Sequence, residues 1–435
     1  VISGCSGGNS KTTAPGAGNS ENASGKEIQM TFPTYLAGEN VGAVFFLPEI
    51  ERFNQKYAGK YKIVIEEVPQ AQYAEKIKQL AQQNKLPAIV HAPGSGGIDL
   101  QWFKSVVLAN GMAYDLSEFA NANPEVKNNW IDDSMDYCTV DGKLICKPLS
   151  VLKPVGLYYN NTMYKPEKAV KDMKLDEFME SIGDNKFAFQ TAENAWTSGL
   201  LLTALIANQE GGETYLAQYV DDKLYDYNDA KIVSAISILQ KLLQSNASAN
   251  TIGAAYADAA NAFMSKSAAL ICNGSWMASD FDEESADKWS NGFTGEEVTS
   301  DIYPGNFAIA NPRVFGEFWI ANTASDEEKE LAKAFFAFRD SKEEIEQLVL
   351  TEGGVAPKLD YSDEFLKKQA ENHILSQLAG SMDENTRYTA SIFDVMPASV
   401  ADTEFGKLLP KLADGTLTPE EFCSQLTQKA EEAKN

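Results

Sequence analysis

The spacing of hydrophobic residues near the start of the chain alternates between two periods. In some segments apolar residues alternate with polar ones or form short runs, as in β-strands. Between these segments apolar residues recur every three or four positions, as on one face of an α-helix. The expected strands span 28–35, 61–66 and 88–90. The expected helices span 44–57, 73–80 and 100–108. Strands and helices that alternate with short connections predict a doubly wound α/β sheet flanked by helices.

The rest of the chain predicts a second lobe. Residues 144–159 read as extended chain around two prolines, and we expect the chain to cross between lobes there. Further helices are expected at 200–207, 232–243, 325–339 and from Thr418 onward, with strands at 268–273 and 318–320. A length of 435 residues also favours two lobes over one core. The expected division is a flexible tether at 1–25, a first lobe of 26–152 plus 305–349, and a second lobe of 153–304 plus 350–435.

Charge and hydropathy narrow the range of partners. The chain holds 62 acidic and 37 basic residues, a formal net charge of -25. This field repels phosphate backbones and anionic lipid, so we expect no nucleic-acid partner. No stretch approaches the roughly 20 apolar residues of a membrane-spanning helix, so we expect a soluble body.

The first residues predict a lipid anchor. Ile2-Ser3-Gly4-Cys5 has the small residues that precede a signal-peptidase cleavage site, and Cys5 would then be the lipid-bearing N-terminus. The Gly-, Ser- and Asn-rich tract behind it is too poor in apolar groups to fold and predicts a flexible tether. Together they resemble the lipobox and stalk of a bacterial lipoprotein, which places the domain outside the cytoplasmic membrane or in the periplasm. The alternative is a chance Gly-Cys pair.

The remaining cysteines and the histidines limit metal and disulfide chemistry. Cys138 and Cys146 flank Asp141-Gly142, a strong hairpin signal, so the two sulfurs either form a disulfide or stay as free, half-buried thiols. The cysteines show no metal-site spacing. The chain has only two histidines, far apart in sequence, which excludes a His-rich metal site. We expect no metal and no cofactor.

Five phrases together resemble one family. They span 34–40, 156–160, 268–276, 353–357 and 412–422. In their order and spacing the chain resembles the extracellular solute-binding proteins of carbohydrate ABC transporters, maltose-binding-protein-like, from Lys26 to Asn435. The resemblance implies a type II, two-lobed periplasmic-binding-protein-like fold with a cleft between lobes that close by hinge bending. It also implies a binding protein rather than an enzyme, one that captures a sugar, expected to be an oligosaccharide, and delivers it to the permease subunits. We expect a monomer, because closure needs freedom between the lobes.

A sugar site needs flat aromatic rings for the apolar faces of the sugar and short polar groups for its hydroxyls. By resemblance, Trp196 and Trp276 face the cleft; the alternative for each is a core tryptophan. In open α/β sheets, ligands lie beyond the carboxyl ends of strands. The two loops at those ends offer Tyr35, Glu39, Asn40, Ser95 and Asp99.

Several other residues are weaker candidates. His91 could donate to a hydroxyl or be a structural histidine, and Glu317 could reach the ligand. Asp99 has helix N-capping as its alternative role. Trp319 fits a buried strand better than a site, and Trp102 fits either. Arg387 and Asp394 belong to a stretch that often approaches the cleft in the family.

Other functions stay open at this point. The same fold could bind a polyamine, a peptide or an anion, although the candidate loops carry no arginine for an anion. A secreted carbohydrate-active enzyme is the main alternative of another class. Gly94-Ser95-Gly96 is preceded by Pro93 and so fails the nucleophile-elbow pattern, and no His-Glu-x-x-His occurs. A catalytic carboxylate pair is compatible with so many acidic residues. A purely structural surface lipoprotein is the third alternative.

Overall fold

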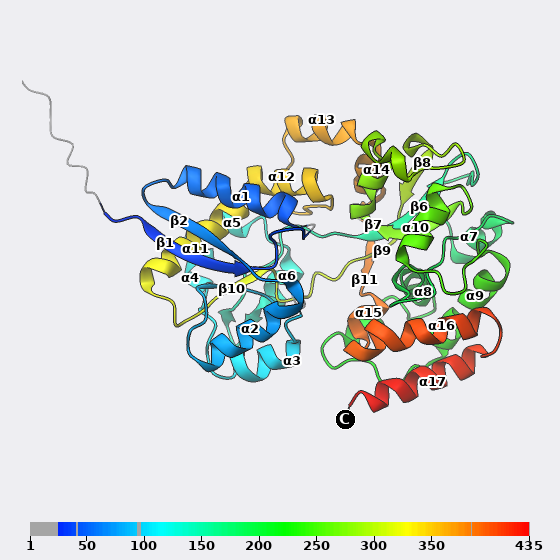
Figure 1. Ribbon diagram of the computed structural model, residues 1–435, viewed down its shortest axis with the longest axis horizontal. Helices are drawn as coiled ribbons and strands as arrows, with labels where there is room; N and C mark the ends of the chain where they lie inside the picture. Colours follow the sequence, from blue (N-terminus) through cyan, green and yellow to red (C-terminus); the bar gives the residue numbers. More distant parts are fainter. Residues whose placement is uncertain (1–24, 41, 94–96, 384, 435) are drawn as a thin grey trace, which may run out of the picture.

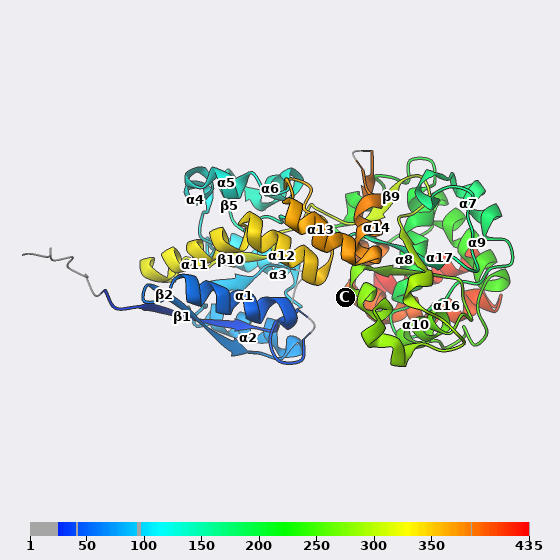
Figure 2. The ribbon, with the colours of Figure 1, turned by 90° about the horizontal axis from the view of Figure 1, so that it is seen from above.

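The protein, described here by a computed structural model, forms two lobes that lie side by side (Figures 1 and 2). The structure describes residues 25–40, 42–93, 97–383 and 385–434. Cys5, most of the expected tether and Ser95 lie outside these residues. Each lobe has its own hydrophobic core, and each core is built from strands covered by helices. The mixed α/β architecture expected from the sequence is confirmed.

The strands of the first lobe form separate two-stranded sheets and alternate with helices. Strands β1 (Ile28–Thr34) and β2 (Tyr61–Glu67) pair in parallel, and β3 (Ile89–His91) pairs antiparallel with β10 (Phe318–Ile320). The hairpin strands are β4 (Thr139–Val140) and β5 (Lys143–Leu144). Its helices are α1 (Ala43–Lys56), α2 (Gln70–Gln82), α3 (Leu100–Trp102), α4 (Ser117–Ala122), α5 (Pro124–Lys127), α6 (Asp132–Cys138), α11 (Asp326–Arg339) and α12 (Lys342–Glu352).

The second lobe contains a five-stranded sheet. Strand β6 (Val155–Asn160) pairs antiparallel with β7 (Leu270–Gly274), β8 (Val298–Asp301) and β9 (Phe307–Ile309), and β11 (Arg387–Thr389) joins β9 in parallel. Its helices are α7 (Leu175–Ile182), α8 (Trp196–Ala207), α9 (Ala230–Ser245), α10 (Tyr256–Met264), α14 (His373–Ser381), α15 (Ile392–Val395), α16 (Phe405–Ala413) and α17 (Pro419–Glu432). Helix α13 (Asp363–Glu371) lies between α12 and α14.

Three extended segments join the lobes, near 147–155, 310–317 and 352–356. Two of them pair with each other, since Leu152 and Val355 exchange both backbone hydrogen bonds, at 2.8 and 2.9 Å. The first segment is also tied to the first lobe, where the Lys147 N–H donates to the carbonyl of Phe318 at 2.8 Å. Figure 1 shows thin extended chain at this junction between the lobes. The expected crossing around Pro148 and Pro154 therefore lies at the junction.

The elements expected from hydrophobic spacing are present, with small differences. The helix expected at 100–108 starts as α3 and continues as a wider π-helical segment, Phe103–Leu108. The expected division into lobes stays a prediction, but one strand needs correcting. We assigned 305–349 to the first lobe, whereas β9 pairs with β6 and its Phe307 packs in the second core. A three-residue strand has too little pattern to indicate which sheet it joins.

The four cysteines in the described part of the chain are free and buried. The predicted hairpin forms, but its register places Cys138 opposite Ile145, whose N–H donates to the Cys138 carbonyl at 3.0 Å. Cys146 is therefore offset by one residue, and side chains one residue apart on a strand point to opposite faces. Of the two alternatives left open by the sequence, the structure has the free thiols.

Candidate functional site

Three aromatic rings gather at one edge of the second lobe. Trp276 directly follows β7 in the 3₁₀ segment Ser275–Phe281, Trp196 is the first residue of α8, and Tyr256 is the first residue of α10. The ring centroids of Trp196 and Trp276 lie 5.3 Å apart at 40°, and those of Trp196 and Tyr256 lie 6.5 Å apart. We call these three residues the aromatic cluster.

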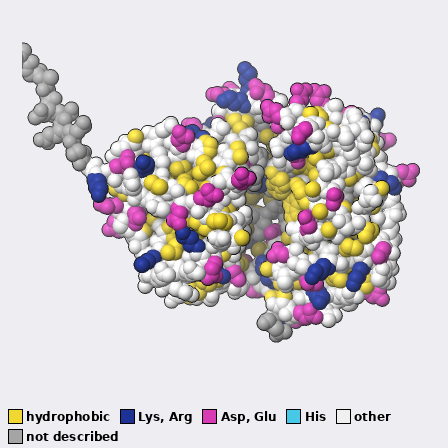
Figure 3. All heavy atoms as spheres, in the orientation of Figure 1, with side chains coloured by type: hydrophobic (Ala, Val, Ile, Leu, Met, Phe, Trp, Pro, Cys, Tyr) yellow, Lys and Arg dark blue, Asp and Glu magenta, His cyan; other side chains and the backbone are white. Residues whose placement is uncertain are grey.

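The aromatic cluster lies at the edge of the second lobe that faces the junction. Gly274, at the carboxyl end of β7, pairs with Val155, where the crossing segment enters β6. The Ser275 hydroxyl donates to the carbonyl of Glu352, at the start of another crossing, at 3.3 Å. The space-filling view shows hydrophobic side chains on the second lobe beside the hollow between the lobes (Figure 3). The two sequence-predicted tryptophans therefore lie together at the interlobe side.

A rigid loop positions Trp196. Within it, Glu193 and Ala195 have positive φ values of 56° and 51°, which are rare for residues with a Cβ. Gln190 Nε2 donates to a carboxylate oxygen of Glu193 at 3.1 Å and to Asn194 Oδ1 at 3.3 Å, and the Trp196 N–H donates to Asn194 Oδ1 at 3.2 Å. These contacts give hydrogen-bond partners to polar groups that would otherwise be unpaired at the start of a buried helix.

Tyr256 was missed by the sequence reasoning. Its backbone N–H donates to the Glu193 carboxylate at 3.0 Å, and its hydroxyl accepts from Asn273 Nδ2 at 3.0 Å, so it is held by the same loop and by β7. The only sequence signal was one tyrosine at the start of a short helix, which is equally typical of a core residue. Its place becomes visible only when β7, α8 and α10 come together.

The aromatic cluster offers an exposed aromatic surface on which a ligand can stack, not a gap between two rings. A centroid separation of 5.3 Å means that the two indoles touch, so no sugar ring fits between them. Trp276 is 41% exposed, which is unusual for so large an apolar side chain, whereas Trp196 is half-buried against the second core. A ligand with an apolar face can therefore stack on the outer surface of the cluster.

The first lobe and the crossing segments line a pocket of about 490 Å³. Four of the predicted site residues line it: Tyr35, Asn40, His91 and Glu317. Arg339 of α11 also lines it, and the crossing segments contribute Lys153, Asn311 and Glu352. Glu352 also bonds to Ser275, the neighbour of Trp276, so this pocket and the aromatic cluster meet at the junction.

His91 contacts other residues of the first lobe through its ring and its backbone. Its Nε2 lies 2.8 Å from the Thr34 hydroxyl, its backbone N–H donates to the Tyr73 hydroxyl at 3.0 Å, and its ring lies 4.5 Å from that of Tyr35. Burial, with the nearby positive charge of Arg339, lowers the pKa of His91 to about 3. The imidazole is therefore neutral at physiological pH, and its role in ligand binding stays a prediction.

Glu317, which lines the pocket, belongs to a largely buried network of charges. It accepts from Arg339 Nε at 2.8 Å and pairs with Lys147 at 2.8 Å, and Lys147 also pairs with Asp340 at 2.7 Å. Burial alone would raise the pKa of Glu317, but Arg339 and Lys147 outweigh it and hold this pKa below its usual range. Glu317 is therefore ionised and already paired.

Glu49 is the anomalous member of this network. It is fully buried and pairs with Arg339 through one oxygen, while its Oε2 has no hydrogen-bond partner among the described residues. Burial raises the pKa of Glu49 to about 8, against the opposing effect of Arg339. A proton on this carboxyl removes the cost of burying an incompletely paired charge.

The other predicted residues have local roles or lie apart. Asp99 caps α3, with Oδ1 accepting from the N–H groups of Gln101 and Trp102 at 2.6 and 3.1 Å, as its alternative role predicted. Glu39 is exposed, and Asn40 bonds to Gln70 at 3.1 Å.

The structure also places the two remaining candidate tryptophans and the two C-terminal candidates. Trp319 is fully buried in β10, which confirms the prediction of a core residue, and Trp102 packs partly buried against the first core. Arg387 pairs with Glu213 at 2.8 Å, and the Asp394 carboxylate accepts from the Ser391 N–H at 2.9 Å. Neither Arg387 nor Asp394 lines the pocket at the junction.

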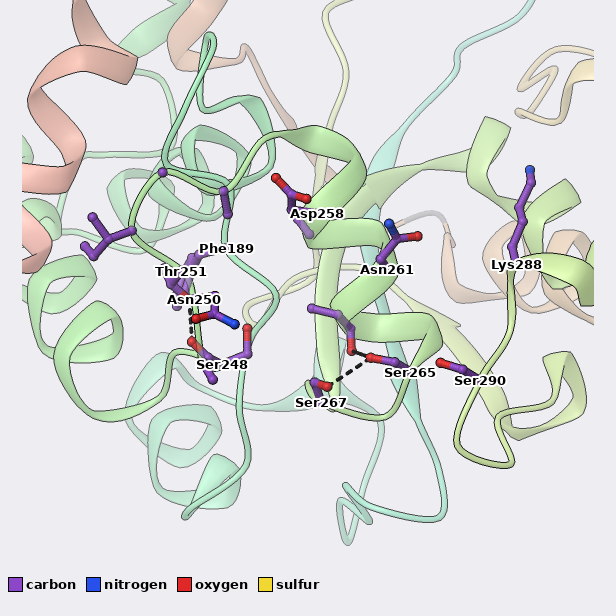
Figure 4. A pocket seen from close by; sticks show the side chains of 16 residues that line it. Phe189, Ser248, Asn250, Thr251, Asp258, Asn261, Ser265, Ser267, Lys288 and Ser290 are labelled. Carbon is purple, nitrogen blue, oxygen red and sulfur yellow. Dashed lines mark hydrogen bonds between the residues drawn. The ribbon is translucent and has the colours of Figure 1, made fainter.

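A second pocket, of about 480 Å³, is lined in part by residues of α10 (Figure 4). Short polar side chains line it, and two of them, Ser265 and Ser267, bond to each other at 2.9 Å. None of the predicted site residues lines it. Its one ring, Phe189, is buried in the second core, so the pocket lacks the exposed aromatic surface of the cluster.

The sequence and the fold both match known proteins. The family model described as bacterial extracellular solute-binding protein matches residues 50–373, so the chain belongs to this family. The family predicted from the sequence is thereby confirmed. The family is extracellular, and it consists of binding proteins. Within the described residues, no helix combines the length and the apolar character that a membrane span requires. Among curated proteins, no sequence matches this chain.

Solved structures share the two-lobed fold along nearly the whole chain. A chitin oligosaccharide binding protein matches at 17% identity over 93% of this chain and 98% of its own, with a TM-score of 0.66. Two Streptococcus pneumoniae proteins are similar. Apo RafE matches at 16% identity over 94% and 99%, with a TM-score of 0.68. A solute-binding protein in complex with the blood group A-trisaccharide matches at 18% over 93% and 100%, with a TM-score of 0.65. The expected two-lobed fold is confirmed.

Proposed function

We propose that the protein captures an oligosaccharide between its lobes and delivers it to the permease of an ABC importer. The observation that carries this proposal is the aromatic cluster at the interlobe side, with Trp276 41% exposed and next to the polar lining of the junction. Indole faces bind the apolar faces of sugar rings, and carboxylates and amides bind hydroxyls. The names of the structural neighbours, which include oligosaccharide-binding proteins, support the same class of ligand.

The binding step is a shift between open and closed forms. Ligand that contacts both the aromatic cluster and the first-lobe pocket stabilises the closed form by its differential affinity for that form. The paired crossings at Leu152 and Val355 are the natural place for the hinge. In this proposal the protein is a monomer and performs no catalysis, with lipid on Cys5 holding it at the outer face of the membrane.

The test is thermal unfolding of residues 26–435 with a panel of ligands. The panel contains chitin, xylan and maltose oligosaccharides, raffinose and a blood-group trisaccharide, with spermidine and a short peptide as alternatives. At a hundredfold excess over the dissociation constant, a true ligand adds about 2.7 kcal/mol of stability. Chromatography of the recovered glycan must show it intact. A response to spermidine alone would replace the sugar proposal with a polyamine one, because aromatic faces also bind cations.

Trp276→Ala locates the site. We expect it to weaken sugar binding at least tenfold while leaving the unfolding midpoint of the free protein unchanged. Trp289→Phe is the matched control, since Trp289 is a half-buried tryptophan of the same lobe whose ring packs on Phe293 outside the cluster. Unchanged affinity in Trp276→Ala would remove the aromatic cluster from the site.

The lipid anchor has its own test. The chain carrying a bacterial lipoprotein signal peptide is expressed with a radiolabelled fatty acid, and wild type is compared with Cys5→Ala. We expect label and membrane association in wild type only. Label that persists in Cys5→Ala would refute the anchor without affecting the proposal of sugar binding.

A further inference from the structure

Gly274 occupies a position where the backbone does not require glycine. It ends β7 with φ -96° and ψ 175°, an extended conformation open to any residue. A Cβ at Gly274 would nevertheless lie within 3.0 Å of three carbons of the Trp276 six-membered ring. The obstacle to a larger residue is therefore the indole of the aromatic cluster, which lies directly over Gly274.

The backbone of Gly274 is held in place on both sides. Its N–H donates to Asn273 Oδ1 at 2.9 Å, its carbonyl accepts from the buried Tyr158 hydroxyl at 2.7 Å, and it pairs with Val155 in the sheet. Trp276, by contrast, is the most exposed member of the aromatic cluster. A side chain added at Gly274 would therefore displace the indole rather than the strand.

From this packing we infer that Gly274 is a positioning residue for sugar binding, acting through the indole of Trp276. The inference rests on the proposed function for its effect on affinity. With no Cβ beneath it, the ring settles onto the end of β7 and reaches Trp196, where the two indoles form one surface. Raising the ring by a methyl group would tilt it away from Trp196 and remove that surface.

The experiment is a double-mutant cycle with Gly274→Ala, Trp276→Ala and the double variant. Sugar affinity is measured by calorimetry with the oligosaccharide that stabilises wild type best. We expect Gly274→Ala alone to weaken binding at least fivefold and to cause no further loss when added to Trp276→Ala. An equal loss in both backgrounds would show that Gly274 acts independently of the indole and would overturn the inference.

Two readouts do not depend on sugar. Near-ultraviolet circular dichroism reports the contact between the two tryptophans, and we expect Gly274→Ala to reduce the signal that Trp276→Ala removes. The second readout is stability in urea. If Gly274→Ala folds poorly, the double variant should recover, because the obstructing ring is absent. An unchanged spectrum in Gly274→Ala, or a poorly folding Gly274→Ala that the double variant does not rescue, would refute the inference.

The matched control is Gly380→Ala. Gly380 lies in α14 of the same lobe, and nothing lies within 4 Å of a Cβ built there. This substitution should leave affinity and spectrum unchanged. If wild type binds no sugar on the panel, the proposed function fails, while the spectrum and the urea cycle still decide whether Gly274 positions Trp276.

Discussion

The two sides of the candidate interlobe site are built in opposite ways. On the first lobe, His91 is bonded to Thr34 and Glu317 is paired with Arg339 and Lys147, so these polar groups already have partners. On the second lobe, Trp276 keeps a large part of its indole exposed although burial would be favourable. The first side is therefore held rigid by its own contacts, and the second side presents surface that is free for a ligand.

The difference between paired polar groups and an exposed indole shows which candidate residues are the stronger ones for ligand binding. A polar residue at the end of a strand is a good candidate only until its partners are known, because buried polar groups are nearly always satisfied within the protein. An exposed tryptophan lacks such a structural explanation. We therefore expect substitutions on the first side to change mainly stability, and substitutions in the aromatic cluster to change mainly affinity.

The largest effect is expected at Lys147, which is fully buried between Asp340 and Glu317. Lys147→Met leaves the buried Asp340 carboxylate without its cation, while Glu317 keeps Arg339, and should lower the free energy of unfolding by about 3–5 kcal/mol. Urea denaturation measures this loss. The control is Lys104→Met, which breaks a half-exposed pair with Asp221 at 3.5 Å and should cost less than about 1 kcal/mol. Equal losses of unfolding free energy in the two variants would mean that the buried pairs of Lys147 stabilise the first lobe no more than an exposed ion pair does.

The second prediction concerns Glu49 and pH. Below pH 4.5 the carboxyl is protonated in both the folded and the unfolded chain. Between 4.5 and about 8 the unfolded chain releases the proton and the folded protein keeps it, so wild type loses stability as pH rises through this window. Because one pKa unit corresponds to about 1.4 kcal/mol, the rise from 4.5 to about 8 sets an upper limit of about 5 kcal/mol on the total loss.

Glu49→Gln should remove this pH dependence. Its stability advantage over wild type is expected to grow from pH 5 to pH 8, measured by urea denaturation at each pH. Glu51→Gln, on the exposed side of the same helix, controls for the loss of one carboxylate. An advantage for Glu49→Gln that shrinks with rising pH would mean that Glu49 is ionised and that Arg339 outweighs burial.

The sequence predicted the fold well because periodicity and capping are local signals. The helix expected from Ser325 begins there, with the Ser325 hydroxyl accepting from the Glu328 N–H at 3.2 Å, and the helix expected from Thr418 is capped in the same way. The sheet to which a three-residue strand belongs is not a local property. That is why β9 was assigned to the wrong lobe.

The candidate site was only partly predictable. Trp196 and Trp276 were found through resemblance and sugar chemistry, and the structure brings their rings into contact. Tyr256 and Gly274 were not found, because their roles depend on which rings lie over them after folding. For His91 and Glu317, the sequence showed a polar residue beside a strand but not the partner that satisfies it.

The third prediction separates two members of the aromatic cluster. Trp196 is half-buried on the second core, so Trp196→Ala should lower the free energy of unfolding by about 1–2 kcal/mol and also weaken sugar binding about tenfold. Trp276→Ala should weaken binding without the loss of stability. Calorimetry and urea denaturation on both variants test this pattern. A stability loss that is larger in Trp276→Ala would reverse the assignment of supporting and contacting rings.

The smallest effect is expected at Asp99, where the capping and ligand roles make different predictions. Capping requires an acceptor for two N–H groups, and both Asp and Asn supply one. Asp99→Asn should therefore keep both stability and sugar affinity, whereas Asp99→Ala should cost about 1 kcal/mol of stability with little change in affinity. Urea denaturation and calorimetry distinguish the roles. A tenfold loss of affinity in Asp99→Asn, with stability intact, would show that the carboxylate binds the ligand. Polar groups of the first lobe would then bind the ligand in addition to their partners within the protein.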